Sequence, residues 1–166
     1  MSPAKLATLP ARAQTWLTYD RSITEAASVL TGVQACVSSL SQQAQYAPLW
    51  LPAPYRSDEQ TYARQIELMS GACRVLIAVS YTRPDSDLAE RLEVLDRAPL
   101  ANLLFQTGSA QNPTKTYVQT GFWCGRLVEW QVAGCDTPLI LLELFDPDFV
   151  KRYTPPTTTG SAEPEI

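Results

Sequence analysis

TYARQIELMSGACRVLIAVSYT, residues 61–82, contains two strand-like runs separated by a short turn. The runs Thr61–Met69 and Cys73–Thr82 are rich in β-branched, aromatic and aliphatic residues, which are typical of strands. Ser70-Gly71-Ala72 lies between them and supplies the turn. This segment therefore predicts two strands of a β-sheet.

Further strand-like runs lie on both sides of this segment. They are, in chain order, Val33–Leu40, Ala44–Leu51, Thr114–Trp123, Arg126–Ala133 and Thr137–Phe145. Gly134-Cys135-Asp136 is a plausible hairpin turn between the last two. The first two of these runs alternate only partly, and we predict about six strands from the seven runs.

Helical patterns occupy the remaining segments and come in clusters. Pro10–Tyr19 is followed by Ser22-Ile23-Thr24-Glu25, a capping-box pattern that opens a helix reaching Leu30, with Gly32 closing it. A second helical block, Ser86–Phe105, is expected to break at Pro99, because proline disfavours helical geometry in the residue before it. Helices that cluster rather than alternate with strands predict an α+β fold on an antiparallel sheet.

The composition is that of one folded domain with a polar tail. The chain has 166 residues, of which 45% are hydrophobic and 18% are charged, and this length suits a single domain. We assign residues 1–153 to that domain. Residues 154–166, TPPTTTGSAEPEI, have almost no apolar side chain and are expected to form a disordered tail.

Charge and residue usage exclude several classes of function. Thirteen Lys and Arg against seventeen Asp and Glu give a net charge of −4, which lacks the basic footprint of a nucleic-acid binder. The chain has no histidine, so histidine-based triads and zinc sites are excluded. The cysteines, Cys36, Cys73, Cys124 and Cys135, form no CxxC pair, so we expect no metal site.

The apolar segments are short. The longest, Pro138–Phe145, is far below the length of a membrane span, and residues 1–17 lack the apolar core of a signal peptide. We therefore expect a cytoplasmic protein, without membrane insertion, whose thiols are free and mostly buried.

Two charged residues lie where a charge is costly. Glu143 interrupts the apolar run Pro138–Phe145, and a carboxylate there must be paired or hydrogen-bonded. It either serves a ligand or reaches water or a structural arginine at an edge position, and the pattern favours neither. Period-two alternation places Arg64 on the more apolar face of its strand, with Tyr62 and Ile66. An inward arginine is half of a buried ion pair or a carboxylate-binding fork in a cavity, and taken alone the structural reading is favoured.

Two helix starts could add backbone donors. Ile23 lies just inside a helix N-terminus, and Leu100 follows Pro99 at a position suited to the start of another helix. First-turn amides lack intrahelical acceptors and attract anions, although ordinary capping by Ser22 and solvent is the common alternative.

Five segments, in order, resemble the bacterial chorismate pyruvate-lyases, which make 4-hydroxybenzoate for quinone biosynthesis. The segments are Ser22-Ile23-Thr24, Tyr62-Ala63-Arg64-Gln65-Ile66, Arg97-Ala98-Pro99-Leu100 with Leu104-Phe105, Gly121-Phe122-Trp123-Cys124-Gly125-Arg126, and the run 138–147, PLILLELFDP. None of the segments is diagnostic alone, but together they cover most of the chain.

The resemblance implies a monomeric α+β fold with a small enclosed ligand cavity, chorismate as substrate and no cofactor. It assigns binding of the ring carboxylate to Arg64 and contact with the ring hydroxyl to Glu143, so that these two are the expected catalytic residues. It also implies ligand contacts from the backbone amides of Ile23 and Leu100.

The chain departs from this family at one position that bears on substrate recognition. Many members carry a second arginine where Ser80 falls, and neither Arg74 nor Arg83 takes its place cleanly. Chorismate has two carboxylates, so recognition of its enolpyruvyl end is in question. The alternative function is a non-catalytic sensor of small aromatic acids, similar to the UTRA effector-binding domains of transcription regulators.

Overall fold

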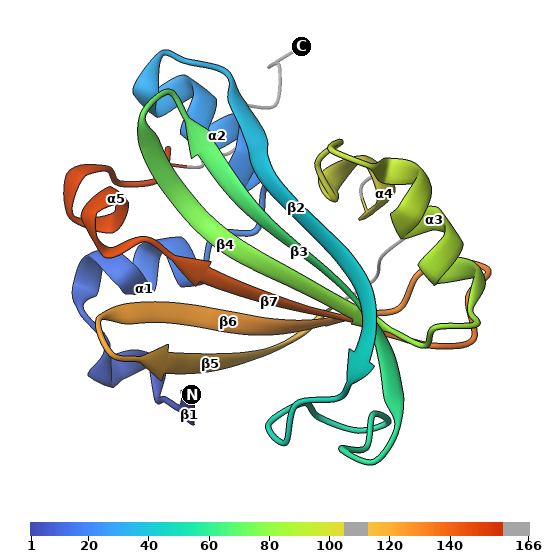
Figure 1. The fold of residues 1–166 in the computed structure, drawn as a ribbon. Coiled ribbons are helices and arrows are strands. Elements are labelled where there is room, and N and C mark those ends of the chain that lie inside the picture. The colour runs from blue at the N-terminus through green and yellow to red at the C-terminus, as the bar shows by residue number, and fades with distance from the viewer. Residues whose placement is uncertain (105–112, 158–166) are drawn as a thin grey trace, which may run out of the picture.

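Seven antiparallel strands form one open sheet in the part of the chain that the computed structural model describes, residues 1–104 and 113–157 (Figure 1). The strand order is β1-β5-β6-β7-β4-β3-β2. The strands are β1 (Ser2–Pro3), β2 (Ala35–Tyr46), β3 (Gln60–Ser70), β4 (Cys73–Thr82), β5 (Thr114–Thr120), β6 (Trp123–Trp130) and β7 (Leu139–Phe145). The predicted antiparallel α+β class is confirmed, with one strand more than the predicted six.

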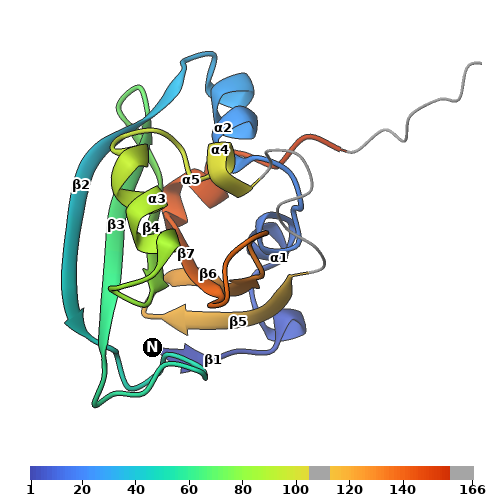
Figure 2. The same cartoon turned by 90° about the vertical axis from the view of Figure 1, so that its right-hand side faces the viewer.

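The helices gather on one side of the curved sheet (Figure 2). The described residues contain a short 3₁₀ helix, η1 (Leu6–Thr8), and five α-helices: α1 (Ala11–Leu17), α2 (Ile23–Thr31), α3 (Asp87–Leu95), α4 (Ala101–Leu104) and α5 (Pro147–Arg152). Their apolar residues pack with one face of the sheet into a single core that includes Trp16, Leu92 and Phe149. The helices therefore enclose this face of the sheet.

Helix α2 begins and ends where its sequence predicts. The Ser22 side chain accepts a hydrogen bond from the Glu25 amide, and Gly32 closes the helix with a φ of 72°. The helical block expected over residues 86–105 is broken as predicted, into α3 and α4, while Phe105 lies outside the described residues. The break already begins at Asp96, whose φ of 46° no longer fits a helix.

The prediction of two strands over Val33–Leu40 and Ala44–Leu51 is wrong. Residues 35–46 form a single strand, because Gln42 and its neighbours continue the ladder with β3, where Gln42 lies opposite Arg64. The intervening Ser-Gln-Gln sequence lacks apolar alternation, since β2 is an edge strand and several of its side chains face solvent.

The turn between β5 and β6 lies three residues earlier than predicted. The strands were expected to meet between Trp123 and Arg126, but the chain turns at Gly121, whose φ of 57° favours glycine. Trp123 and Cys124 consequently belong to β6. The sequence analysis also missed β1 and α5, whereas the predicted strand Thr137–Phe145 is present as β7.

The second face of the sheet carries a smaller core of its own. It contains Val79, Tyr81, Leu127, Ile140 and Leu142, and the segment 47–55 packs over them. Successive residues of β7 thus alternate between two cores, which explains why its run is apolar throughout.

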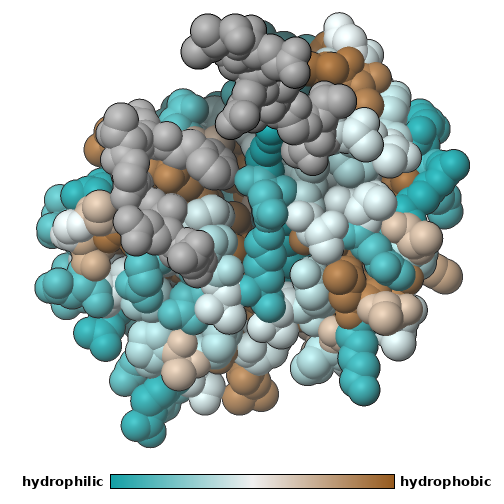
Figure 3. Space-filling view, turned by 180° about the vertical axis from the view of Figure 1, so that it is seen from behind, coloured by the Kyte–Doolittle hydropathy of each residue, from teal (hydrophilic) through white to brown (hydrophobic). Residues whose placement is uncertain are grey.

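Among the described residues, no helix has the length and apolar character needed to cross a membrane. On the face seen from behind, hydrophobic side chains form small groups among hydrophilic ones (Figure 3).

All four cysteines are free, but the expectation that most are buried is wrong. Only Cys124 is buried, and Cys36 is exposed because it points outward from edge strand β2. Residues 154–157 of the predicted tail form no regular structure, and 158–166 lie outside the described part.

Candidate functional site

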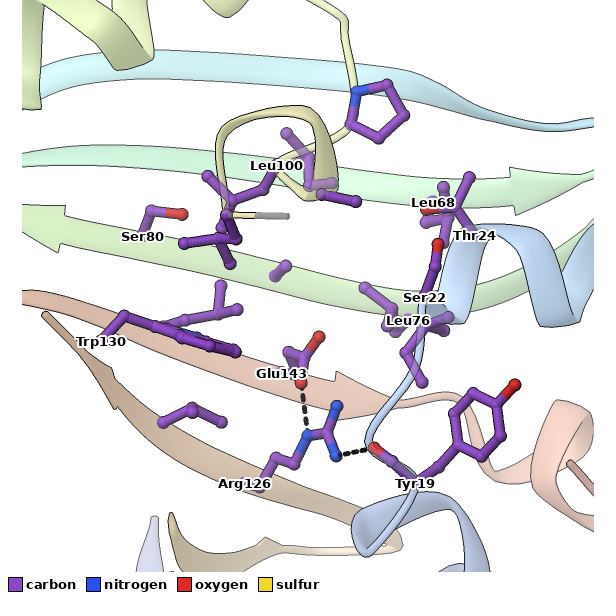
Figure 4. Close-up of a pocket in the computed structure, with 18 of the residues that line it drawn as sticks. Tyr19, Ser22, Thr24, Leu68, Leu76, Ser80, Leu100, Arg126, Trp130 and Glu143 are labelled. Atoms are coloured by element: carbon purple, nitrogen blue, oxygen red, sulfur yellow. Dashed lines mark hydrogen bonds and ion pairs between the residues drawn. The ribbon is translucent and has the colours of Figure 1, made fainter. Parts of the chain in front are cut away.

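A cavity of about 550 Å³ lies between the sheet and the helices that cover it. Its floor comes from β3, β4, β6 and β7, and its rim from the segments that precede α2 and α4 (Figure 4). Its lining includes all four predicted site residues, Ile23, Arg64, Leu100 and Glu143. This volume lies within the range of sites for small molecules.

Arg64 is almost fully buried, with 1% of its surface exposed. It lies on the apolar face of β3 as predicted, between Tyr62 and Ile66. Its Nη2 donates to the carbonyl oxygens of Asp96 and Ala98, at 2.8 and 2.9 Å. The break between α3 and α4 supplies these carbonyls, so the irregular segment holds the guanidinium in place.

The charge of Arg64 is not matched by a carboxylate. It forms no ion pair within the described residues, and its Nε is buried there without a hydrogen-bond partner. Burial lowers the pKa of Arg64, while the neighbouring Tyr62 and Asp96 act in the opposite direction. A buried cation without a counter-ion is costly by itself and becomes favourable when an anion binds. Of the two readings that the sequence left open, a buried ion pair of Arg64 is absent from the described residues, and the carboxylate-binding fork stays a prediction.

Glu143 lies on β7 and is also buried. The edge position considered for it is wrong because β7 lies between β6 and β4, but the structural arginine named in the same alternative is present, as Arg126. Its Oε2 accepts a hydrogen bond from the Nε of Arg126 at 2.5 Å. This pairing compensates much of the cost of burying the carboxylate.

Arg126 is the lining residue that the sequence analysis missed. Its Nη1 also donates to the carbonyl oxygens of Leu17 and Tyr19, at 3.0 and 2.6 Å. Leu17 is the last residue of α1, so the guanidinium satisfies backbone acceptors at a helix C-terminus. The signal was present in the sequence, because Arg126 interrupts an apolar run just as Arg64 does. The misplaced β5–β6 turn had put Arg126 at a strand end, where a charge is unremarkable.

The two predicted backbone donors lie on the rim. Ile23 is the first residue of α2. Leu100 lies one residue before α4 instead of inside it, because the helix begins only at Ala101. Figure 4 shows Leu100 across the pocket from Arg126, and Ser22 and Thr24 at the start of α2 to one side of it.

Ser80 lies on the cavity floor beside Arg64. The two residues are register partners on β4 and β3, and Ser80 is 1% exposed. Neither of the other arginines considered for this place lines the cavity: Arg74 pairs with Asp146, and Arg83 is exposed. No arginine therefore replaces Ser80 on β4 in the described part of the chain.

The described lining is cationic although the protein is acidic. Its charged side chains are Asp20, Arg21, Arg64, Lys115, Arg126 and Glu143, with a formal sum of +2. Lys115 bonds to Asp20, and Arg126 to Glu143, which leaves Arg64 and the exposed Arg21 without a carboxylate partner among the residues that the structure describes. This balance favours an anionic ligand.

Among the described residues, no cluster of three acidic or thiol side chains could hold a metal ion.

Comparison with protein-family models gives no match, and comparison with curated proteins gives none either. The site must therefore be interpreted from its own geometry.

Proposed function

We propose that the protein is a chorismate pyruvate-lyase, which converts chorismate into 4-hydroxybenzoate and pyruvate. The observation that carries the proposal is a buried arginine without a counter-ion, Arg64, in the same small cavity as a buried carboxylate, Glu143. A ligand that suits both groups has a carboxylate at one end and a hydrogen-bond donor at the other.

Chorismate has these two groups. Its ring carboxylate would pair with Arg64, and its C4 hydroxyl would donate to Glu143. The apolar lining between them, which includes Ile66, Ala78 and Leu141, suits the ring. Its second carboxylate, on the enolpyruvyl group, needs another cation. Arg126 and Lys115 of the described lining are paired with Glu143 and Asp20, so Arg21 is the basic residue left to supply it.

The reaction is an elimination that the site can assist by orientation and electrostatics. The C4 hydrogen leaves as a proton, and its electron pair enters the ring while the C3–O bond breaks. The products are 4-hydroxybenzoate and enolpyruvate, which takes up a proton on carbon to become pyruvate. Formation of the aromatic ring drives the step.

The test is incubation of the purified protein with chorismate, with pyruvate followed by a coupled dehydrogenase and the aromatic acid by chromatography. We expect the two products in equal amounts, with turnover reduced in Arg64→Met. Pyruvate together with another aromatic acid would indicate changed regiochemistry, and Ser80 would be the first residue to examine. Tight binding of 4-hydroxybenzoate without turnover would support the sensor instead. If the protein shows neither turnover nor binding, both functions are refuted.

A Glu143→Gln variant tests the role of the carboxylate within that reaction. A large loss of kcat, of the order expected for a general base (~100-fold or more), would assign proton removal to Glu143. A rate close to wild type would limit Glu143 to positioning the substrate.

A further inference from the structure

Arg126 joins three separate parts of the molecule. From β6 it donates to the Glu143 carboxylate on β7 and to two carbonyl oxygens in and just after helix α1. Its guanidinium also lies 5.9 Å from the centre of the Phe145 ring. With 6% of its surface exposed, Arg126 has little freedom to take another position.

Only one of the two carboxylate oxygens of Glu143 is bonded to Arg126. Oε2 accepts from Arg126, whereas Oε1 has no hydrogen-bond partner within the described residues. Figure 4 shows the second oxygen directed away from Arg126 and toward the interior of the pocket. A carboxylate held at one oxygen and open at the other presents a fixed acceptor to a ligand.

We propose that Arg126 is a positioning residue, which holds Glu143 by Oε2 so that Oε1 accepts a hydrogen bond from a ligand hydroxyl para to the carboxylate on Arg64. This inference rests on the proposed function, because it assumes a para-hydroxy ring in the cavity. It adds that recognition of the hydroxyl depends on Arg126, which itself does not contact the ligand.

The geometry requires an arginine. The fork of Arg126 presents Nε to the carboxylate and Nη1 to the backbone, in directions set by one rigid plane. A lysine has a single ammonium group and cannot reproduce this arrangement. We therefore expect Arg126→Lys to restore hydroxyl recognition only in part.

The experiment compares the affinities for 4-hydroxybenzoate and benzoate, which differ only in the para hydroxyl, by isothermal titration calorimetry. A hydrogen bond to a charged acceptor predicts that the wild type prefers 4-hydroxybenzoate by roughly ten- to a hundred-fold. We expect Arg126→Met and Glu143→Leu each to reduce this ratio to near one. The double variant should lower it no further, since Arg126 acts through Glu143.

The matched control is Arg91→Met. Arg91 also donates to a backbone carbonyl, that of Ala133, but it is exposed and lies outside the cavity lining. It should keep the wild-type ratio. The double variant Arg126→Met, Glu143→Leu also controls for misfolding of the single variant Arg126→Met, because it leaves no unpaired carboxylate in the core.

A folded Arg126→Met protein that keeps the wild-type ratio would overturn the inference. So would equal losses of affinity for both ligands, which is the signature of a purely structural role. If Arg126→Met does not fold, an unchanged ratio in Arg126→Lys would overturn it as well. A wild-type protein that turns chorismate over but binds 4-hydroxybenzoate without preference over benzoate would overturn this inference and leave the proposed function standing. A wild-type protein with neither turnover nor binding would remove both.

Discussion

The two faces of the sheet use the same strands for different purposes. On the face covered by helices, four polar or charged side chains are buried around a cavity: Arg64, Ser80, Arg126 and Glu143. On the opposite face, the alternating residues of these strands, such as Val79 and Ile140, join a core of apolar and aromatic side chains.

The elements that pack over the two faces of the sheet explain the difference. Helices α2 and α4 leave a space above the sheet, and polar groups around a space can serve a ligand. The segment 47–55 instead lies closely on the other face, where Trp50 contacts Tyr81 at 5.7 Å between ring centres and Tyr55 donates to the carbonyl of Pro138. We infer that substitutions on the first face change ligand binding and that those on the second change stability.

The largest effect is expected from Arg64→Met, on the cavity face. Under the proposed role of Arg64, loss of its charge-assisted contact with the ligand carboxylate should weaken the binding of 4-hydroxybenzoate by on the order of a hundred-fold or more. Calorimetric titration measures this, and Arg91→Met again serves as a control that removes an equal charge outside the cavity. Unchanged affinity in a folded Arg64→Met protein would refute the assignment of Arg64.

Ile140→Ala, in contrast, should lower stability and leave ligand binding unchanged. Ile140 is 1% exposed in the second core, and truncation of such a residue typically costs about 3 kcal/mol of the free energy of unfolding. Urea denaturation should show this loss, while the affinity for 4-hydroxybenzoate stays at the wild-type value. A comparable loss of affinity would mean that the two faces do not act independently.

Gly125→Ala should affect both faces, because it acts on the contact between β6 and β7. A Cβ at position 125 would lie 2.5 Å from the carbonyl oxygen of Glu143 and 2.6 Å from Leu144 Cδ2, so the strands would have to move apart. We expect a destabilisation of about 2 kcal/mol, together with weaker hydroxyl recognition by Glu143. Cys124→Ala on the same strand adds no volume and is the control. Wild-type stability and ligand preference in Gly125→Ala would contradict the close contact.

The smallest effect concerns the second face at high pH. Burial raises the pKa of Tyr81 to about 12 from an ordinary value of 10.0. The folded protein therefore keeps the phenol neutral where the unfolded chain ionises, so stability from Tyr81 is complete below pH 10 and is lost as the pH rises toward 12. At pH 11 the loss is about 1 kcal/mol.

Tyr81→Phe should remove this part of the alkaline destabilisation, as measured by urea denaturation at pH 8 and pH 11. Tyr46→Phe, at a position that is 68% exposed, is the control. If Tyr81→Phe follows the same pH dependence as the wild type, Tyr81 is not the buried group that resists ionisation.

Much of this arrangement could be predicted from local patterns. The Ser22 cap and Gly32 mark α2 because they satisfy its terminal backbone groups. Alternation placed Arg64 on the buried face of β3, and the apolar run around Glu143 indicated a strand covered on both sides. Predictions that needed the positions of turns or edges were less accurate, as the single strand β2 and the early turn at Gly121 show.

By itself, the sequence indicated that Arg64 and Glu143 are costly to bury and that Arg64 lies on the apolar face of its strand, since alternation and desolvation are local properties. Only the tertiary structure decided their partners. It paired Glu143 with Arg126, left Arg64 without a carboxylate among the described residues, and brought Ile23 and Leu100 to one rim. The physical reason is that strand order and the packing of helices on the sheet bring together residues far apart in the chain, and no local pattern encodes those distances.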